Sequence, residues 1–365
     1  EIRLSLVGSE MCIRDRIKDV CSMQIQENIS LRPYNTFAID AKARYFASFK
    51  EIDALEEALN FKHQTPNLIL GGGSNLLLTK DFDGLVLKNE ITGIAELHED
   101  NNYVYVKVGA GENWHQFVLY CIKRNWAGVE NLSLIPGNVG ASPMQNIGAY
   151  GVETNDVFYN LEAFHLKEKK LVTFTRNDCA FGYRDSIFKE KYKNQFVILN
   201  VTFQLQKKPY FNTSYGAIEQ ELERMGVKEL SLRAVSDAVI NIRSSKLPNP
   251  AEIANAGSFF KNPEVTPGKY EELRLSFPGI IAHLLANGNY KLAAGWLIEQ
   301  SGPDKNGTSW KGFRRGDAGC HAKQALVLVN YGSATGKDIY QLSENILQSV
   351  NEKFAVQLER EVNII

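Results

Sequence analysis

The stretch 135–153 reads IPGNVGASPMQNIGAYGVE. It contains four glycines and several amide or hydroxyl side chains, with Glu153 as its single charged residue. Glycine loses more conformational freedom on folding than any other residue, so ordering such a run is costly without a partner. A neutral, amide-rich loop suits a large uncharged heterocycle with a pyrophosphate tail. A long surface loop without a ligand is the alternative interpretation.

A second glycine-rich segment, LGGGSNL at 70–76, follows a predicted strand at 68–70. Three successive glycines let the backbone approach a ligand closely, and their N–H groups can form an anion-binding nest. The spacing is not that of a dinucleotide-binding fingerprint, because position 76 is Leu. Phosphate binding and a simple tight turn both remain open for this segment.

Length and composition indicate a globular protein of two or three domains. The chain has 365 residues, of which 44% are hydrophobic and 23% charged. A formal net charge of −1 argues against a nucleic-acid or anionic-membrane partner. No apolar run approaches the roughly 18 residues of a membrane span. The five cysteines include no C-x-x-C pair, so a disulfide framework is not expected and a reducing cytoplasm is the simpler assumption.

Hydrophobic periodicity predicts an alternation of short strands and isolated helices. Helices are expected at 51–61, 217–225 and 235–242, around Trp114, Phe117, Val118, Cys121 and Ile122, and along Ile339, Leu342, Ile346, Val350 and Phe354. Strands are expected at 68–70, 84–88, 103–108, 171–175, 196–203 and 325–330. Residues 1–22 lack clear periodicity and precede Met23, so they are predicted to be extraneous or a disordered tail.

Other motifs are weak when taken singly. The segment 332–337, GSATGK, resembles a Walker loop, but its glycines are too close and Asp338 follows the Lys, so it is predicted to be a turn that caps the last helix. The six histidines form no metal-binding spacing, and no catalytic metal is expected. In FGYRDS (181–186) an Arg lies beside an aromatic and an Asp, which suits either the stabilisation of a developing oxyanion or a structural ion pair. In LEREV (358–362) either carboxylate is an acid–base candidate or a surface charge.

The order of these segments, in contrast, is specific. NTF (35–37), LGGGSN, the 135–153 stretch, FGYRDSIFK, SKLPNP, GSFFKNP, AAGWLIEQ and LEREV follow one another along the chain. In this order the sequence resembles the UDP-N-acetylenolpyruvoylglucosamine reductase family over nearly everything after residue 30. The segment 183–189 and the stretch around Tyr215 resemble the longer of the two subtypes of that family, which carries a tyrosine loop.

The resemblance implies an α+β fold with an FAD-binding module of the vanillyl-alcohol-oxidase (PCMH) type. The implied divisions are a first FAD-binding subdomain at 23–89, a second at 90–247 and a substrate-binding C-terminal domain at 248–365. FAD is expected to be bound without a covalent bond. The positions that match cofactor contacts are Asn35, Gly71, Gly72, Gly73, Ser74, Asn75, Pro136, Gly137, Asn138, Gly140, Ala141, Ser142, Gln145, Asn146, Gly148, Ala149, Tyr150 and Gly151.

The resemblance also implies the reaction and its residues. Hydride passes from NADPH by way of FAD to the enolpyruvyl group of UDP-N-acetylglucosamine enolpyruvate, a step towards peptidoglycan. Ser258 matches the general acid, and Arg184 with Glu361 matches the pair that stabilises the intermediate. Tyr183, Tyr215, Lys246, Asn262 and Gln324 match substrate contacts. A cytoplasmic monomer without nucleic-acid or membrane partners is expected.

Two departures from the family pattern lie near the C-terminus. Arg360 stands where relatives often have Pro, and Asn363 where a basic residue is common. Relatives usually continue beyond the position of Ile365, so a truncated C-terminus is expected. Two other functions stay open: a sugar oxidase on the same FAD scaffold, although neither glycine-rich loop carries the His or Cys that would tether the flavin, and a non-catalytic flavin-binding module.

Overall fold

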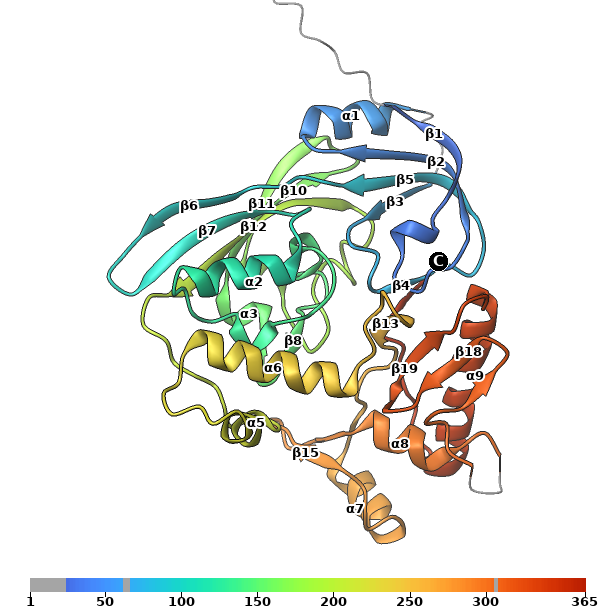
Figure 1. Cartoon of the computed structure of the whole chain (residues 1–365). Helices are drawn as coiled ribbons and strands as arrows, with labels where there is room; N and C mark the ends of the chain where they lie inside the picture. The colour runs from blue at the N-terminus through green and yellow to red at the C-terminus, as the bar shows by residue number, and fades with distance from the viewer. Residues whose placement is uncertain (1–23, 62–65, 305–307) are drawn as a thin grey trace, which may run out of the picture.

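The computed structural model describes residues 24–61, 66–304 and 308–365. The predicted extraneous segment at 1–22 lies outside these ranges. Three main sheets follow one another along the described chain, and Figure 1 shows helices lying against each of them.

The first sheet has four strands in the order β1-β2-β5-β3. These are β1 (Gln26–Ser30), β2 (Lys42–Phe49), β5 (Phe82–Asn89) and β3 (Asn67–Leu70). The last three run parallel, and helix α1 (Ile52–Asn60) provides the crossover from β2 to β3. Parallel strands buried on both faces are rich in hydrophobic residues, as in the buried centre of β5.

The second sheet is antiparallel, in the order β11-β10-β12-β7-β6. Its strands are β6 (Ile94–Glu99), β7 (Tyr103–Gly109), β10 (Phe158–His165), β11 (Lys170–Thr175) and β12 (Phe196–Gln206). Helix α2 (Trp114–Lys123) buries the five predicted side chains in the core beneath this sheet. The surrounding helices are the short α3 (Thr154–Val157), α4 (Arg176–Cys179) and α5 (Ile218–Arg224) and the longer α6 (Leu232–Lys246).

The third sheet has the order β13-β19-β18-β17 and lies in the C-terminal part of the chain. Its strands are β13 (Ala254–Ser258), β17 (Arg314–Arg315), β18 (Ala318–His321) and β19 (Gln324–Asn330). Helices α8 (Ala294–Ser301) and α9 (Gly336–Phe354) pack against it. A small sheet of β14 (Glu264–Val265), β16 (Tyr290–Leu292) and β15 (Ala282–Leu284) extends beside α7 (Pro267–Ser276).

The end of the chain returns to the first glycine-rich segment. Strand β20 (Asn363–Ile364) pairs in parallel with β4 (Leu76–Leu77), and the Thr79 N–H donates to the Ile365 carbonyl at 2.8 Å. Residue 361 is therefore held close to the loop 71–75.

The predicted helices and strands are confirmed, with small shifts at their ends. The largest shift is in α6, predicted at 235–242, because Ser231 caps its first turn and the helix continues to Lys246, just before Leu247 and Pro248. The Walker-like segment is confirmed as a turn: Thr335 caps α9, and the Asp338 carboxylate bonds back to the Thr335 N–H.

Candidate active site

The two glycine-rich loops lie directly against each other. The Ser74 hydroxyl donates to the Pro136 carbonyl at 3.2 Å, and Asn75 Nδ2 donates to Gln145 Oε1 at 2.5 Å. A side chain on Gly72 would lie 2.7 Å from the Gly137 Cα atom. Glycine at these positions permits the close backbone approach, so the two predicted cofactor loops form one continuous surface.

Gly73 has a second steric reason to be glycine. Its φ is +64°, and a Cβ atom there would lie 1.9 Å from the Tyr34 carbonyl oxygen. The Gly73 carbonyl in turn accepts the Thr36 N–H at 3.0 Å. Within the described chain, the N–H groups of residues 72–74 donate to no protein acceptor. Successive unpaired N–H groups in such a turn suit a phosphate oxygen.

Three of the predicted amide side chains brace the loops from within. Asn35 Nδ2 donates to the carbonyls of Leu31 and Ile39, and its Oδ1 accepts the Ile39 N–H. Asn138 Nδ2 donates to Gly111, while Asn146 bonds to Glu153, Gly182 and Asn155. Their bonds to the protein fix the loop shape, and a loop fixed in this way presents its backbone groups to a ligand without further ordering cost.

The end of the 135–153 stretch is a hairpin of β8 (Gly148–Ala149) and β9 (Val152–Glu153). Tyr150 and Gly151 form its two-residue turn with positive φ angles of 51° and 77°. This geometry matches the turn preferred in tight hairpins. Asn131 Nδ2 donates to the Tyr150 carbonyl at 2.9 Å and so supports the turn from below.

Two buried polar atoms at this site have no protein partner in the described residues: Ser142 Oγ and Arg243 Nε. The Ser142 side chain is fully buried, and Arg243 projects from α6 near Tyr150 and Arg184. Burial lowers the pKa of Arg243, with Tyr150 opposing and Arg184 adding to the shift. A buried guanidinium atom and a buried hydroxyl left unpaired are costly, so this site fits a polar ligand with acceptor groups.

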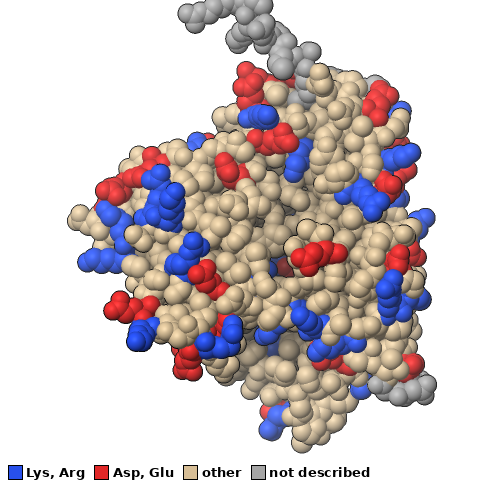
Figure 2. Space-filling model, viewed as in Figure 1, with Lys and Arg blue, Asp and Glu red and all other residues tan. Residues whose placement is uncertain are grey.

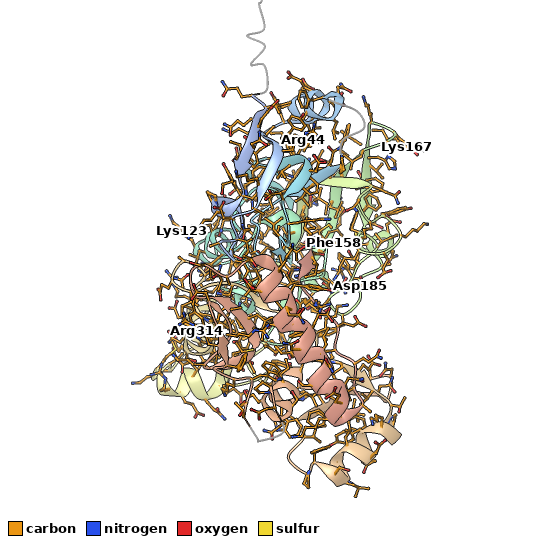
Figure 3. The ribbon with its side chains drawn as sticks, turned by 90° about the vertical axis from the view of Figure 1, so that its right-hand side faces the viewer. Arg44, Lys123, Phe158, Lys167, Asp185 and Arg314 are labelled. Carbon is orange, nitrogen blue, oxygen red and sulfur yellow. The ribbon has the colours of Figure 1, made fainter. Side chains whose placement is uncertain are left out.

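Arg184 and Glu361 form a partly buried ion pair. The distance from Arg184 Nε to Glu361 Oε1 is 3.2 Å, and the two side chains are 19% and 13% exposed. Arg184 Nη2 also donates to the Gly148 carbonyl at 2.6 Å, which connects the pair to the β8–β9 hairpin. Arg184 has a φ of +54°, a conformation that costs a non-glycine residue about 1–2 kcal/mol. Figure 3 labels the next residue, Asp185, at the level of helix α9.

Several cations surround the Glu361 carboxylate. Burial raises its pKa above the ordinary range, and Arg184, Lys189 and Lys261 oppose that shift. Burial lowers the pKa of Lys189, and the nearby Lys261 adds to this effect. On the face drawn in Figure 2, Lys and Arg side chains gather in the lower centre, at the level of α6 and α8 in Figure 1. The site is thus arranged for an anionic ligand.

Ser258 directly precedes Phe259, the residue whose backbone contacts Glu361. It ends β13 after a bulge at Gly257, whose φ is +72°, and pairs with Val327 of β19. The next residue, Phe259, accepts the Glu361 N–H at 2.8 Å. Bulges of this kind are common beside functional sites. The structure therefore brings the three predicted catalytic residues into one region.

Known proteins resemble the chain over nearly its whole length. The profile of the UDP-N-acetylenolpyruvoylglucosamine reductase C-terminal domain matches residues 249–365, and that of an FAD binding domain matches residues 43–169. A UDP-N-acetylenolpyruvoylglucosamine reductase of Amoebophilus asiaticus is 54% identical over 94% of this chain and 100% of its own length. One of Pseudomonas putida is 49% identical over 94% and 99%. The chain belongs to the UDP-N-acetylenolpyruvoylglucosamine reductase family.

A solved structure agrees with this assignment at the level of the fold. The reductase of Thermus caldophilus has a TM-score of 0.64 and 23% identity, covering 94% of this chain and 99% of its own. This likeness confirms the predicted α+β fold class. The FAD-binding profile and membership of the family confirm FAD as the cofactor. Both glycine-rich loops fall inside the region matched by that profile. The unpaired N–H groups of residues 72–74, the close approach at Gly72 and the orphaned Ser142 hydroxyl fit a flavin nucleotide.

The predicted substrate residues of this family member divide into two groups. Asn262 and Gln324 meet at the start of α8: Asn262 Oδ1 accepts the Ala294 N–H at 3.0 Å, and a Cβ on Gly295 would lie 2.9 Å from Gln324 Oε1. Lys246 lies beside His321, at the end of the β18–β19 pair that carries Gln324. Tyr215 is 53% exposed and lies beside the Tyr150–Gly151 turn.

Tyr183 joins the two halves of the site. The Lys291 Nζ atom lies 3.7 Å from the centre of its ring. Burial raises the pKa of Tyr183, while hydrogen bonding from Asn262 lowers it. Because Asn262 and Lys291 come from the C-terminal part of the chain, Tyr183 connects that part to the Arg184 turn.

Besides Lys189 and Lys261, which lie near Glu361, sequence reasoning missed three further cations of this region. Lys88 donates to the Gly71 carbonyl, Lys291 covers Tyr183, and Arg243 carries the unpaired Nε atom. The first two lie on strands and show no motif. Arg243 lies three residues before Lys246 on the same helix, and that i, i+3 spacing was an available signal.

Among residues 24–61, 66–304 and 308–365, no group of three or more His, Cys, Asp or Glu side chains is placed to hold a metal ion. Over the same part of the chain, no helix has both the length and the apolar character of a membrane span.

Proposed function

We propose that this chain reduces the enol ether of UDP-N-acetylglucosamine enolpyruvate to UDP-N-acetylmuramate, with NADPH as the reductant, in the synthesis of peptidoglycan precursors. The observation that carries the proposal is the joining of Arg184, Glu361 and the Ser258 strand next to the flavin loops of a family member. Membership of this family favours reduction over the sugar-oxidase and non-catalytic alternatives.

FAD, when bound, supplies the relay for a hydride between NADPH and the terminal carbon of the enolpyruvyl group. In this proposal the 71–75 loop holds the nucleotide by the backbone N–H groups of residues 72–74, and the 135–153 loop contributes the Ser142 hydroxyl. We propose that FAD contacts the positions at Asn35, 71–75 and 136–151 that the resemblance implies. Among these, Asn35, Asn138 and Asn146 act by fixing the shape of the loops.

Arg184 serves as the fixed cation for the substrate carboxylate, where negative charge accumulates during hydride addition. A preorganised charge in a partly buried site stabilises such charge better than water does. Glu361 holds the Arg184 guanidinium by its Nε atom. Burial raises the pKa of Glu361 while Arg184 opposes the shift, so in this proposal Glu361 is the carboxylate partner of Arg184 in one protonation state and a neutral hydrogen-bond donor beside the intermediate in the other.

Ser258 Oγ donates its proton to the carbon next to the carboxylate and completes the lactyl ether. General acid catalysis of this type contributes about a hundred- to ten-thousand-fold in rate. The proposed surface for the nucleotide sugar is formed by Lys246, Asn262 and Gln324, with Tyr183 and Tyr215.

We also propose the organisation of the protein. The proposed domains are residues 23–89, 90–247 and 248–365, and the chain is of the longer family subtype. FAD is attached without a covalent bond, and the protein is a cytoplasmic monomer.

The test separates the two half-reactions of Ser258→Ala. We expect NADPH to bleach the bound flavin at the wild-type rate, and reoxidation by the enolpyruvyl sugar to slow by at least about a hundredfold. Stopped-flow absorbance of the flavin measures both rates. Ser276→Ala, at the exposed end of α7 in the same part of the chain, is the matched control. Equal loss of both half-reactions, or unchanged turnover, would defeat the general-acid assignment.

A further inference from the structure

The strand segment that carries Glu361 has a second fixed point on its opposite face. Phe260 and Arg360 form an antiparallel bridge, and the Lys261 N–H donates to the Glu359 carbonyl at 2.9 Å. Side chains alternate between the two faces of an extended segment. Glu361 therefore meets Arg184, while Arg360 points to the other side, against α9.

Three side chains of α9 hold Arg360. Its Nε donates to Ser343 Oγ at 2.9 Å, its Nη2 donates to Glu344 Oε1 at 2.5 Å, and its guanidinium carbon lies 4.6 Å from the centre of the Tyr340 ring. Positions 340, 343 and 344 lie on one face of a helix by their i, i+3, i+4 spacing. The Arg360 side chain is only 19% exposed, while Glu344 is 42% exposed, so the ion pair is partly screened by solvent and the buried contact to Ser343 is the better shielded of the two.

The α9 residues are themselves held in place. The Ser343 hydroxyl is fully buried and donates to the Tyr340 carbonyl at 2.6 Å. A hydrogen bond from Tyr340 is the main cause that lowers the pKa of Glu344, and Arg360 adds to it. A planar guanidinium bonded at two atoms and stacked on a ring resists both sliding and rotation.

The other contacts of this segment do not replace the bonds of Arg360 to α9. The ion pair between Glu359 and Lys261 has a length of 3.0 Å, but Glu359 is 74% exposed, and pairs of that kind contribute little. Leu358 and Val362 are buried and anchor the segment in the core, which will keep the fold without Arg360. Buried apolar contacts are not directional, whereas the position of a carboxylate requires directional bonds.

We infer that Arg360 is a positioning residue for the reaction: it clamps the segment 359–361 to Tyr340, Ser343 and Glu344 so that the Glu361 carboxylate meets Arg184. The inference rests on the role of Glu361 given under the proposed function. Loss of the clamp allows Glu361 to move away from Arg184. A displacement of about 1 Å in such a group can cost as much as a hundredfold in rate.

The first measurement needs no cofactor. Hydrogen exchange of the FAD-free protein, followed by mass spectrometry of C-terminal peptides, reports the bonds of the Glu361 and Lys261 N–H groups. In Arg360→Ala we expect these amides to exchange at least about tenfold faster, while α8 amides keep their wild-type rates. Unchanged exchange at 359–362 would overturn the clamp.

The second measurement is the pH dependence of flavin reoxidation by the enolpyruvyl sugar. The groups that face Glu361 are Arg184, Lys189, Lys261 and Tyr183. Arg184 opposes the raised pKa of Glu361, so weakening their contact moves the pH midpoint of the Glu361-dependent limb upward. In Arg360→Ala we expect that upward shift and at least about a tenfold slower reoxidation, with the NADPH half-reaction unchanged.

Two further variants complete the design. Glu344→Ala removes one partner of Arg360 from a partly exposed position on α9. We expect the same faster exchange, slower reoxidation and upward midpoint shift as in Arg360→Ala, but smaller in size. If Arg360→Ala does not fold, this variant decides whether the clamp positions Glu361. Glu359→Gln, on the same segment, is the matched control and should leave exchange, rate and midpoint at wild-type values. A wild-type midpoint and rate in Arg360→Ala, or in Glu344→Ala if that variant has to stand in, would refute the inference.

Glu361→Gln separates this inference from the proposed function. If that variant abolishes the pH limb while Arg360→Ala leaves it in place, Arg360 is not a positioning residue. If Glu361→Gln leaves rate and limb unchanged, the assigned role of Glu361 is wrong, and the exchange measurement alone decides whether Arg360 orders the segment.

Discussion

The N–H of Glu361 donates a 2.8 Å hydrogen bond to the carbonyl of Phe259. This bond places the carboxylate of the last segment of the chain beside the strand that ends in Ser258. Asn75 Nδ2, which belongs to the first flavin loop, also donates to the Glu361 carbonyl at 3.3 Å. The cofactor loop, the proposed general acid and the buried carboxylate are thus coupled through the backbone of one residue.

The environment of Glu361 predicts how stability depends on pH. Its pKa in the folded protein is raised, so the folded state holds this proton more tightly than the unfolded state. The stabilisation is complete below the ordinary glutamate value of about 4.3 and is lost as the pH rises through the folded value. We therefore expect the free energy of unfolding of Glu361→Gln, relative to the wild type, to increase as the pH rises through that window.

Urea unfolding at a series of pH values measures the difference. Glu359→Gln removes an exposed carboxylate from the same segment and controls for the change in net charge. A relative stability of Glu361→Gln that falls as the pH rises would mean that the Arg184 ion pair outweighs burial, and the direction given for the Glu361 pKa would be wrong.

Gly73 is the position in the cofactor loop 71–75 where the structure tolerates substitution least. Gly73→Ala would force an L residue to a φ of +64° and place its Cβ atom 1.9 Å from the Tyr34 carbonyl oxygen. The left-handed conformation costs about 1–2 kcal/mol, and the overlap adds about 1–3 kcal/mol. We expect unfolding at lower urea concentration and a loss of bound FAD, read from the flavin absorbance of the purified protein.

Gly268→Ala is the matched control for that variant. Gly268 lies in α7, and apart from its chain neighbours and the backbone of its own helix, no atom of the described residues lies within 4 Å of the position of an added Cβ. In a helix the same substitution should stabilise by about 0.5–1 kcal/mol and leave the FAD content unchanged. A Gly73→Ala protein with wild-type stability and full flavin content would show that the loop can relax.

Local patterns predicted the elements whose burial follows a simple period. The helices α2 and α9 bury the side chains expected from their spacing, because an amphipathic helix needs only one core to face. The two glycine-rich loops were also recognisable, since Gly73 and the Tyr150–Gly151 turn require backbone angles that glycine favours.

What the sequence could not provide depends on contacts between distant residues. Nothing local distinguishes Glu361 from Glu359, and the two share one face of the extended segment. Glu361 is nevertheless 13% exposed beside Arg184, whereas Glu359 is 74% exposed beside Lys261. The amides of Asn35 and Asn146 were expected at the cofactor, and their internal bonds to the loops became visible only in three dimensions. Which amides brace and which bind is decided by tertiary geometry.

Ser142 offers a test of the flavin site in which the FAD-free and the FAD-bound protein respond to one substitution in opposite directions. Its hydroxyl is fully buried, and among the described residues it has no hydrogen-bond partner. A buried unpaired hydroxyl costs about 1–3 kcal/mol. Ser142→Ala should therefore raise the melting temperature of the FAD-free protein or leave it unchanged. If the hydroxyl bonds to bound FAD, the same variant should weaken FAD binding by about two- to tenfold.

Ser133→Ala is the matched control, because Ser133 is a buried serine with a purely structural role. Ser133 is equally buried, but its hydroxyl donates to the Glu130 carbonyl at 2.7 Å and lies 2.8 Å from Ser236 Oγ. Its loss leaves the Ser236 hydroxyl short of a partner and should destabilise the FAD-free and FAD-loaded forms alike. Thermal unfolding of both forms, with FAD titration followed by flavin fluorescence, distinguishes the two serines. A Ser142→Ala protein that loses stability without FAD and keeps wild-type FAD affinity would remove Ser142 from the cofactor site.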